Sequence, residues 1–175
     1  DRRSTLTVSN STISGNEASS RGGGIHNSGT LTLSNSTISG NSATSAGGGI
    51  DSYSYNGDIT LTVSNSTISG NTARRDGGGI YSYSYYGDST VTVSNSIVAG
   101  NTLTGGSSAS DIAHDLGTVT GSFNLIGDAA TAGGLIDDTD GNIVGIDWTK
   151  VLETTIDASQ NTVPNLADNG GPTQT

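Results

Sequence analysis

Four near-copies of one segment, TLTVSNSTISGN in its first copy, occupy most of the first hundred residues of the chain. They span residues 5–16, 30–41, 60–71 and 90–101, so successive copies lie 25, 30 and 30 residues apart. A period of this length is typical of solenoids, in which each repeat forms one coil and neighbouring coils share a continuous core. The repeat therefore predicts a stack of similar coils and outranks every local signal.

The residues inside a copy alternate in the manner of a β-strand. Leu6 and Val8 point one way and Thr7 the other, and Ile13 begins a second short strand. Ile25, at the end of a Gly-Gly-Gly-Ile block, anchors a third. Glycine, serine, threonine and asparagine make up more than half of the 175 residues, and all four have low helix propensity.

These features predict an all-β chain that forms a single right-handed parallel β-helix of about five to six coils. Residues 1–101 form the regular repeats, 102–147 irregular continuing coils, and 148–175 a C-terminal cap or edge segment. The aliphatic residues of the irregular part are expected to continue the core: Ile112, Val119, Leu125, Ile126, Leu135, Ile136, Ile143, Val144 and Ile146.

Asparagine recurs at two positions of the repeat, and stacking of the coils would turn each position into an amide ladder. Asn10 is in phase with Leu6 and Val8, which predicts an inward side chain, and Asn16 lies where the second strand ends. A carboxamide can donate to one neighbour and accept from the other. The expected ladders are Asn10, Asn35, Asn65 and Asn95, and Asn16, Asn41, Asn71 and Asn101. The inward phase also argues against N-glycosylation of the Asn-Ser-Thr triplets at Asn10, Asn35 and Asn65.

Tyrosine is confined to the two longer repeats. The alternation after Ile50 and Ile80 predicts outward side chains that stack in pairs, Tyr53 on Tyr83 and Tyr55 on Tyr85. Such a patch either contacts sugar rings or another subunit, or only stabilises the extended loops. The candidate binding or assembly surface is Tyr53, Tyr55, Tyr81, Tyr83, Tyr85 and Tyr86.

Signals for catalysis or metal binding are weak. His26 and Asp51 are expected to form a surface ion pair on the outward column that also holds Tyr81, without a nucleophile in register. Asp58 and Asp88 stack in one loop column, with Arg74, Arg75 and Asp76 at another corner. Residues 137–142 resemble a calcium loop, but Ile143 stands where an EF-hand needs glycine. We therefore predict no catalytic residues, no metal site and no cofactor.

A regular threonine face raises a further alternative, ice binding. Thr5, Thr30, Thr60 and Thr90 form one row of the repeat. Only the second row is expected to face clearly outward: Thr7, Thr32, Thr62 and Thr92.

The net charge of −10 is unevenly distributed. Residues 1–100 contain six acids and five arginines, a net of −1, whereas residues 101–175 contain ten acids and one lysine, a net of −9. The lack of a basic face argues against nucleic acid as a partner. No apolar stretch is long enough to insert into a membrane. The first repeat starts at Thr5 with no room for a capping unit before it, which predicts self-association or a longer rod.

The repeats, with their GGGIYS blocks, resemble the right-handed β-helices of bacterial surface proteins of the polymorphic outer-membrane type. The segments SFNLIG, GNIVG and NLADNGGPTQT are similar to the C-terminal part of choice-of-anchor β-helix proteins. This resemblance implies export and an extracellular or cell-surface location, and it implies no particular enzyme activity. We therefore expect a non-enzymatic structural or adhesive module that also contacts surface glycans; the alternative is a carbohydrate-binding or carbohydrate-active domain.

Overall fold

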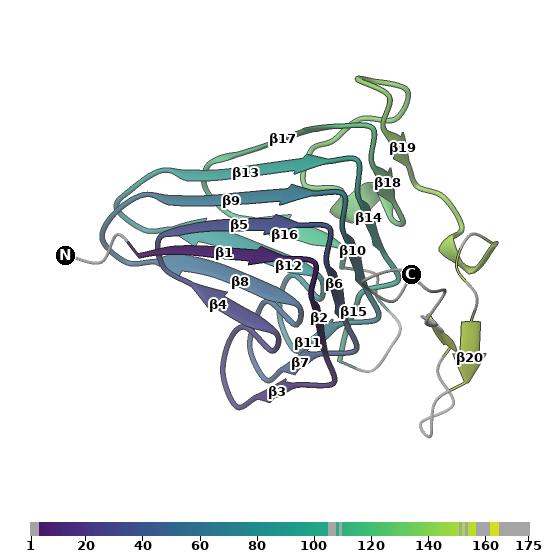
Figure 1. The fold of residues 1–175 in the computed structure, drawn as a ribbon, viewed down its shortest axis with the longest axis horizontal. Helices are drawn as coiled ribbons and strands as arrows, with labels where there is room; N and C mark the ends of the chain where they lie inside the picture. The colour runs from purple at the N-terminus through teal and green to yellow at the C-terminus, as the bar shows by residue number, and fades with distance from the viewer. Residues whose placement is uncertain are drawn as a thin grey trace.

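A computed structural model describes residues 4–104, 108, 110–150, 152, 154–156 and 162–164 and is a stack of β-coils (Figure 1). Four coils each contribute four strands. They are β1 (Thr5–Ser9), β2 (Thr12–Ser14), β3 (Glu17–Ala18) and β4 (Ile25–Asn27); β5 (Thr30–Ser34), β6 (Thr37–Ser39), β7 (Ser42–Ala43) and β8 (Ile50–Ser54); β9 (Ile59–Ser64), β10 (Thr67–Ser69), β11 (Thr72–Ala73) and β12 (Ile80–Ser84); and β13 (Ser89–Ser94), β14 (Ile97–Ala99), β15 (Thr102–Leu103) and β16 (Ile112–His114).

Equivalent strands pair in parallel to form four sheets along the stack. We name them sheet A (β1-β5-β9-β13-β17), sheet B (β19-β18-β14-β10-β6-β2), sheet C (β15-β11-β7-β3) and sheet D (β16-β12-β8-β4). The additional strands are β17 (Thr118–Ser122), β18 (Leu125–Ile126) and β19 (Ile143–Val144). The predicted parallel β-helix is confirmed. Four of its coils are complete and two are incomplete, where the sequence predicted about five to six coils.

The remaining described elements follow the last coil. They are the 3-10 turns η1 (Ala129–Thr131) and η2 (Trp148–Lys150), and β20 (Thr154–Ile156), which pairs antiparallel with β21 (Thr162–Pro164). No helix in the described part of the chain is long and apolar enough to cross a membrane.

The core is a thin column of aliphatic side chains between the sheets. Leu31, Leu61 and Val91 stack in register on sheet A and are fully buried. Leu6, the equivalent residue of β1, is 43% exposed because β1 is the edge strand of the sheet. The regular spacing of the repeat thus fixes both the strands and the core.

The triple glycines let the backbones of adjacent coils approach closely. A Cβ atom on Gly48 would lie 2.3 Å from the carbonyl oxygen of Thr72 and 2.5 Å from that of Gly78. Any side chain at this position would overlap the next coil, so the glycine is required by packing.

The prediction that the Asn10 column points inward is wrong. Asn10, Asn35, Asn65 and Asn95 adopt left-handed backbone angles, with φ near +48°, and their side chains are exposed. A single left-handed residue turns the chain between sheets A and B and resets the alternation, so the following serine is buried instead. Asparagine tolerates this conformation better than most residues. The argument against N-glycosylation therefore fails for Asn10, Asn35 and Asn65, which are all exposed.

Serine forms the inner ladder at this corner. The backbone N–H of Ser36 donates to Oγ of Ser66 (3.1 Å), and that of Ser66 donates to Oγ of Ser96 (3.1 Å). Each hydroxyl in turn donates to the carbonyl oxygen two residues earlier at 2.7 Å. Buried backbone groups at the corner are thereby satisfied.

The second predicted ladder is confirmed. Nδ2 of Asn41 donates to Oδ1 of Asn71 (3.0 Å), and Nδ2 of Asn71 donates to Oδ1 of Asn101 (2.9 Å); all three side chains are fully buried. Asn16 joins at the exposed end, and Asp111 takes the next position after Asn101 (2.9 Å). Burial raises the pKa of Asp111 to about 6, against the lowering effect of the hydrogen bonds from Asn101.

The expectation that every aliphatic residue after Ile112 continues the core is wrong for four of them. Ile146 is half-buried but does not pack against the core. Leu125 faces outward and is half-buried, and Ile136 and Ile143 are 65% and 52% exposed. Leu125 aligns with Ile97 and Ile143 in sheet B, at the outward position that Thr12, Thr37 and Thr67 hold in the first three coils.

Candidate binding surface

Five tyrosines form one aromatic patch on the outer side of sheet D and its loops. Strands β8 and β12 are two residues longer than β4, and this extension carries the side chains. We call the patch the tyrosine cluster: Tyr53, Tyr55, Tyr83, Tyr85 and Tyr86.

The predicted pairs are confirmed by the ring geometry. Tyr55 and Tyr85 stack with centroids 5.2 Å apart and an interplanar angle of 16°, while Tyr53 and Tyr83 lie 5.9 Å apart and are tilted by 37°. Tyr86 packs edge-on against Tyr85 at 4.6 Å and against Tyr55 at 5.4 Å. The rings therefore hold each other in place and form one continuous surface.

Three of these rings are largely open to solvent. The exposed fractions of Tyr55, Tyr85 and Tyr86 are 55%, 49% and 68%. Exposed aromatic rings gathered in one place mark an interaction surface. The Arg21 guanidinium lies 4.4 Å from the ring centroid of Tyr53, so one edge of the cluster is bounded by a cation.

Tyr81 does not belong to the exposed surface, contrary to the prediction from alternation. It is 5% exposed, and its hydroxyl donates to Oδ2 of Asp115 at 2.6 Å. Burial, and then the hydrogen bond to Asp115, raise the pKa of Tyr81 above its ordinary value. Its outward position is covered in part by Arg21, whose guanidinium lies 5.6 Å from the ring centroid.

Beside the cluster, His26 and Asp51 are paired, but not at the surface as predicted. Nδ1 of His26 lies 2.6 Å from Oδ2 of Asp51, whose side chain is fully buried. Arg21 contacts the other carboxylate oxygen at 3.5 Å. The hydrogen bond to Asp51 raises the pKa of His26, with burial and Arg21 opposing it. The imidazole is about half exposed.

Two further acidic residues, Asp58 and Asp137, accept hydrogen bonds within the fold. Oδ1 of Asp58 accepts the backbone N–H of Asp88 (3.0 Å), so this exposed pair helps to join two loops. In the calcium-like segment, Asn142 is buried and accepts from Asn124, while Asp137 accepts the backbone N–H of Val144. Within the described residues, no group of three or more histidine or acidic side chains is placed to hold a metal ion.

The outer face of sheet A is an uncharged array of hydroxyl groups. Both threonine rows face outward over five strands, not one row as expected from the sequence. The rows are Thr5, Thr30, Thr60, Thr90 and Thr118, and Thr7, Thr32, Thr62, Thr92 and Thr120. The alternation of β-strands explains this, because residues two apart share a face.

Two residues of this region make contacts that no sequence pattern predicts, and a third residue that stands out, Phe123, lies on a different face, between β17 and β18. Arg21 and Asp115 lie outside the repeated segment, and no local pattern links them to the tyrosines. Phe123 could have been found, because the register of sheet A aligns it with Asn95 and the earlier corner asparagines.

Comparison with known proteins agrees with the architecture. Residues 1–144 match the family described as right handed beta helix region, and the chain belongs to that family. No curated protein and no solved structure matches the chain significantly.

Proposed function

We propose that this chain is a non-enzymatic adhesive module that acts outside the cell and binds carbohydrate through the tyrosine cluster. The observation that carries the proposal is the group of rings that are about half exposed or more on a rigid, in-register strand pair. Tyrosine offers apolar area for the faces of sugar rings together with a hydroxyl for their polar edges. The rings are already fixed by mutual packing, so little conformational entropy remains to be lost on binding.

The charges around the cluster favour a neutral glycan. Asp58 and Asp88 are exposed in the same loops as Tyr55 and Tyr85. The cation that borders the cluster, Arg21, already contacts the Asp51 carboxylate. An acidic polysaccharide would approach two exposed carboxylates, and like charges repel.

Affinity electrophoresis through gels containing neutral or acidic polysaccharides tests this proposal. A neutral polysaccharide should retard the native protein, and Tyr55→Ser with Tyr85→Ser should abolish the retardation. Phe123→Asn removes an exposed aromatic ring from a different face and is the matched control. Equal migration of native and double-substituted protein in every gel would overturn the proposal.

A carbohydrate-active enzyme is the second candidate, and the His26–Asp51 pair favours it. A buried carboxylate that holds Nδ1 of a half-exposed histidine is an arrangement suited to general acid–base catalysis. Incubation of the same polysaccharides with the protein, followed by measurement of new reducing ends or unsaturated products, separates the candidates. Cleavage that His26→Ala removes would establish the enzyme and contradict the non-enzymatic proposal.

The module is also proposed to be one segment of a longer rod or filament, of the polymorphic outer-membrane or choice-of-anchor type. Leu6 is 43% exposed where Leu31 is fully buried, and edge strands pair readily with added strands. A further coil on β1 would bury Leu6. Sedimentation velocity over a range of concentrations tests for association of this chain, and Leu6→Asp should weaken it. A sedimentation coefficient that stays at the monomer value at every concentration would exclude self-association. The proposal would then be that the chain is one segment of a longer rod.

A further inference from the structure

Phe123 occupies a backbone conformation that suits it poorly. Its φ angle is +57°, at the corner position where the four preceding coils place asparagine. A bulky side chain with positive φ is a strained outlier, and such strain is often associated with function. The ring is nevertheless 67% exposed, so burial in the core does not compensate for the strain.

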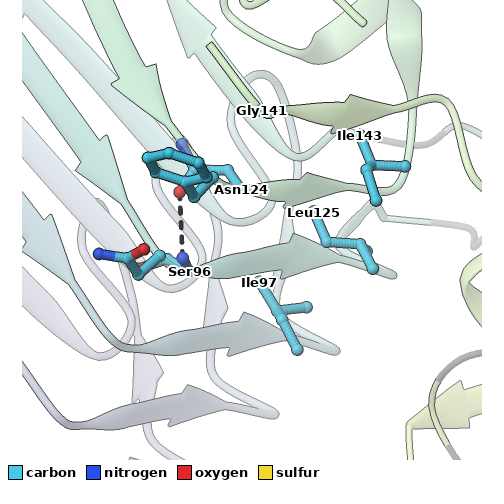
Figure 2. Close-up of a pocket in the computed structure, with 8 residues that line it drawn as sticks. Ser96, Ile97, Asn124, Leu125, Gly141 and Ile143 are labelled. Carbon is cyan, nitrogen blue, oxygen red and sulfur yellow. Dashed lines mark hydrogen bonds between the residues drawn. The ribbon is translucent and has the colours of Figure 1, made fainter. Parts of the chain in front are cut away.

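A second change occurs beside it on sheet B. The outward column that begins with Thr12, Thr37 and Thr67 continues as Ile97, Leu125 and Ile143. Figure 2 shows these three aliphatic side chains one above another. Phe123 lines the same hollow. The column thus changes from threonine, buried at Thr37 and Thr67, to partly or largely exposed aliphatic side chains at the last coils.

Between the ring and the column lies an open hollow of about 330 Å3. Its floor is rigid, because Nδ2 of Asn124 donates to Oδ1 of Asn142 (2.9 Å) and Ser96 N–H donates to Oδ1 of Asn124 (3.0 Å). The Phe123 ring packs on Gly141, where a Cβ would lie 2.5 Å from the ring. We call this hollow the Phe123 groove, lined by Asn95, Ser96, Ile97, Phe123, Asn124, Leu125, Gly141 and Ile143.

The turn that adjoins the groove at Gly141, which we call its rim, is acidic. Asp138 and Asp140 are exposed in the turn that precedes Gly141, and the carbonyl oxygen of Asp140 accepts the N–H of Phe123 (3.0 Å). Two copies joined through this groove would bring the acidic turns of both together, which is unfavourable. A ligand with basic groups around an apolar side chain complements both the rim and the floor.

Docking by strand addition is blocked at this edge. The Val144 N–H, on the open side of β19, donates to Oδ1 of Asp137 at 2.8 Å and is therefore not free to pair with a new strand. An occupant must instead insert side chains into the hollow. We propose that the Phe123 groove binds a peptide segment of a partner protein in which leucine-like side chains alternate with lysine or arginine.

Three fluorescent peptides of equal length test the proposal by anisotropy: Lys-Leu-Lys-Leu-Lys, Lys-Ser-Lys-Ser-Lys and Glu-Leu-Glu-Leu-Glu. The first should bind roughly tenfold or more tightly than either of the others, because it alone supplies both the apolar contacts and the charge. Phe123→Asn should weaken its binding by roughly tenfold or more and at the same time raise the melting temperature, because asparagine suits the left-handed corner.

Ile97→Thr restores the residue type of the earlier coils and should also weaken binding, whereas Tyr85→Ser should leave it unchanged. Equal binding of the serine and leucine peptides, no binding of any peptide, or full binding by Phe123→Asn would each overturn the proposal. A Phe123-dependent dimer in sedimentation would overturn it too, in favour of a second copy. Tyr85→Ser affects only the carbohydrate proposal, so the two proposals can fail separately.

Discussion

Removal of one amide from the buried ladder should destabilise the fold far more than removal of a corner asparagine. Asn71→Ala deletes a side chain that accepts from the backbone N–H and the amide of Asn41 and donates to the carbonyl of Ile38 and to Asn101. Asn101 keeps a donor in the backbone N–H of residue 71. Two groups, the backbone N–H of Asn41 and the carbonyl of Ile38, lose this partner inside the core, while Nδ2 of Asn41 keeps its bond to the Ile13 carbonyl (3.0 Å).

An orphaned buried polar group costs about 1–3 kcal/mol. Two such groups give an expected loss of about 2–6 kcal/mol, and the cavity left by the amide adds to it. Asn65→Ala is the matched control, because it removes an exposed amide at φ +48° and costs only about 1–2 kcal/mol for a left-handed alanine. Asn65→Gly removes even that strain and should be close to neutral.

Urea unfolding followed by circular dichroism measures these differences in parallel for the native protein and the three variants. The transition midpoint should fall most for Asn71→Ala, less for Asn65→Ala, and little for Asn65→Gly. Comparable losses for Asn71→Ala and Asn65→Ala would show that the ladder does not stabilise the core as argued. A larger loss at Asn65 would restore the inward assignment of that column.

Three further predictions concern charge and packing. The pKa of Asp111 is about 6 in the fold against 3.8 in the unfolded chain, so the free energy of unfolding should decrease as pH rises from about 4 to about 6, and Asp111→Asn should flatten this dependence in pH-resolved melts. Asp51→Asn should lower the pKa of His26 in an NMR titration, and an unchanged His26 pKa would contradict the pairing. Because the pKa of His26 is raised in the fold, the stabilisation lost with Asp51 should be largest at acid pH and should fade as pH rises through that pKa. Gly48→Ala should be much more destabilising than Gly15→Ala in the same melts. The Cβ added at Gly48 would overlap the backbone of the next coil, whereas the Cβ added at Gly15 would meet nothing within 4 Å and would cost only about 1 kcal/mol for its left-handed angle. Equal effects of the two substitutions would refute the packing argument.

The repeat made the fold predictable because register, period and composition all agree. Columns such as Leu31, Leu61 and Val91 follow directly from the offsets between copies. The inward direction of Asn10 was mispredicted, since counting by two assumes an unbroken strand and the left-handed corner is invisible to that count. Leu125 and Ile143 were misassigned to the core for a related reason: an aliphatic residue type does not reveal which face of a short strand it occupies.

The candidate site was predictable only where it follows the repeat. The stacked tyrosine pairs lie at equal offsets in consecutive copies, so their contact could be foreseen. The burial of Tyr81 and Asp51 depends on Arg21 and Asp115, which come from different coils and belong to no shared motif. Contacts of this kind, between residues outside the repeat, can be identified only from the three-dimensional structure.

The most direct test of the proposed carbohydrate-binding function is an NMR titration of ring-labelled tyrosines with fragments of a neutral polysaccharide. Resonances of Tyr55, Tyr85 and Tyr86 should shift in a saturable manner, while that of the buried Tyr81 stays unchanged. No shift in the tyrosine cluster with any fragment, or shifts confined to other faces of the protein, would contradict the account.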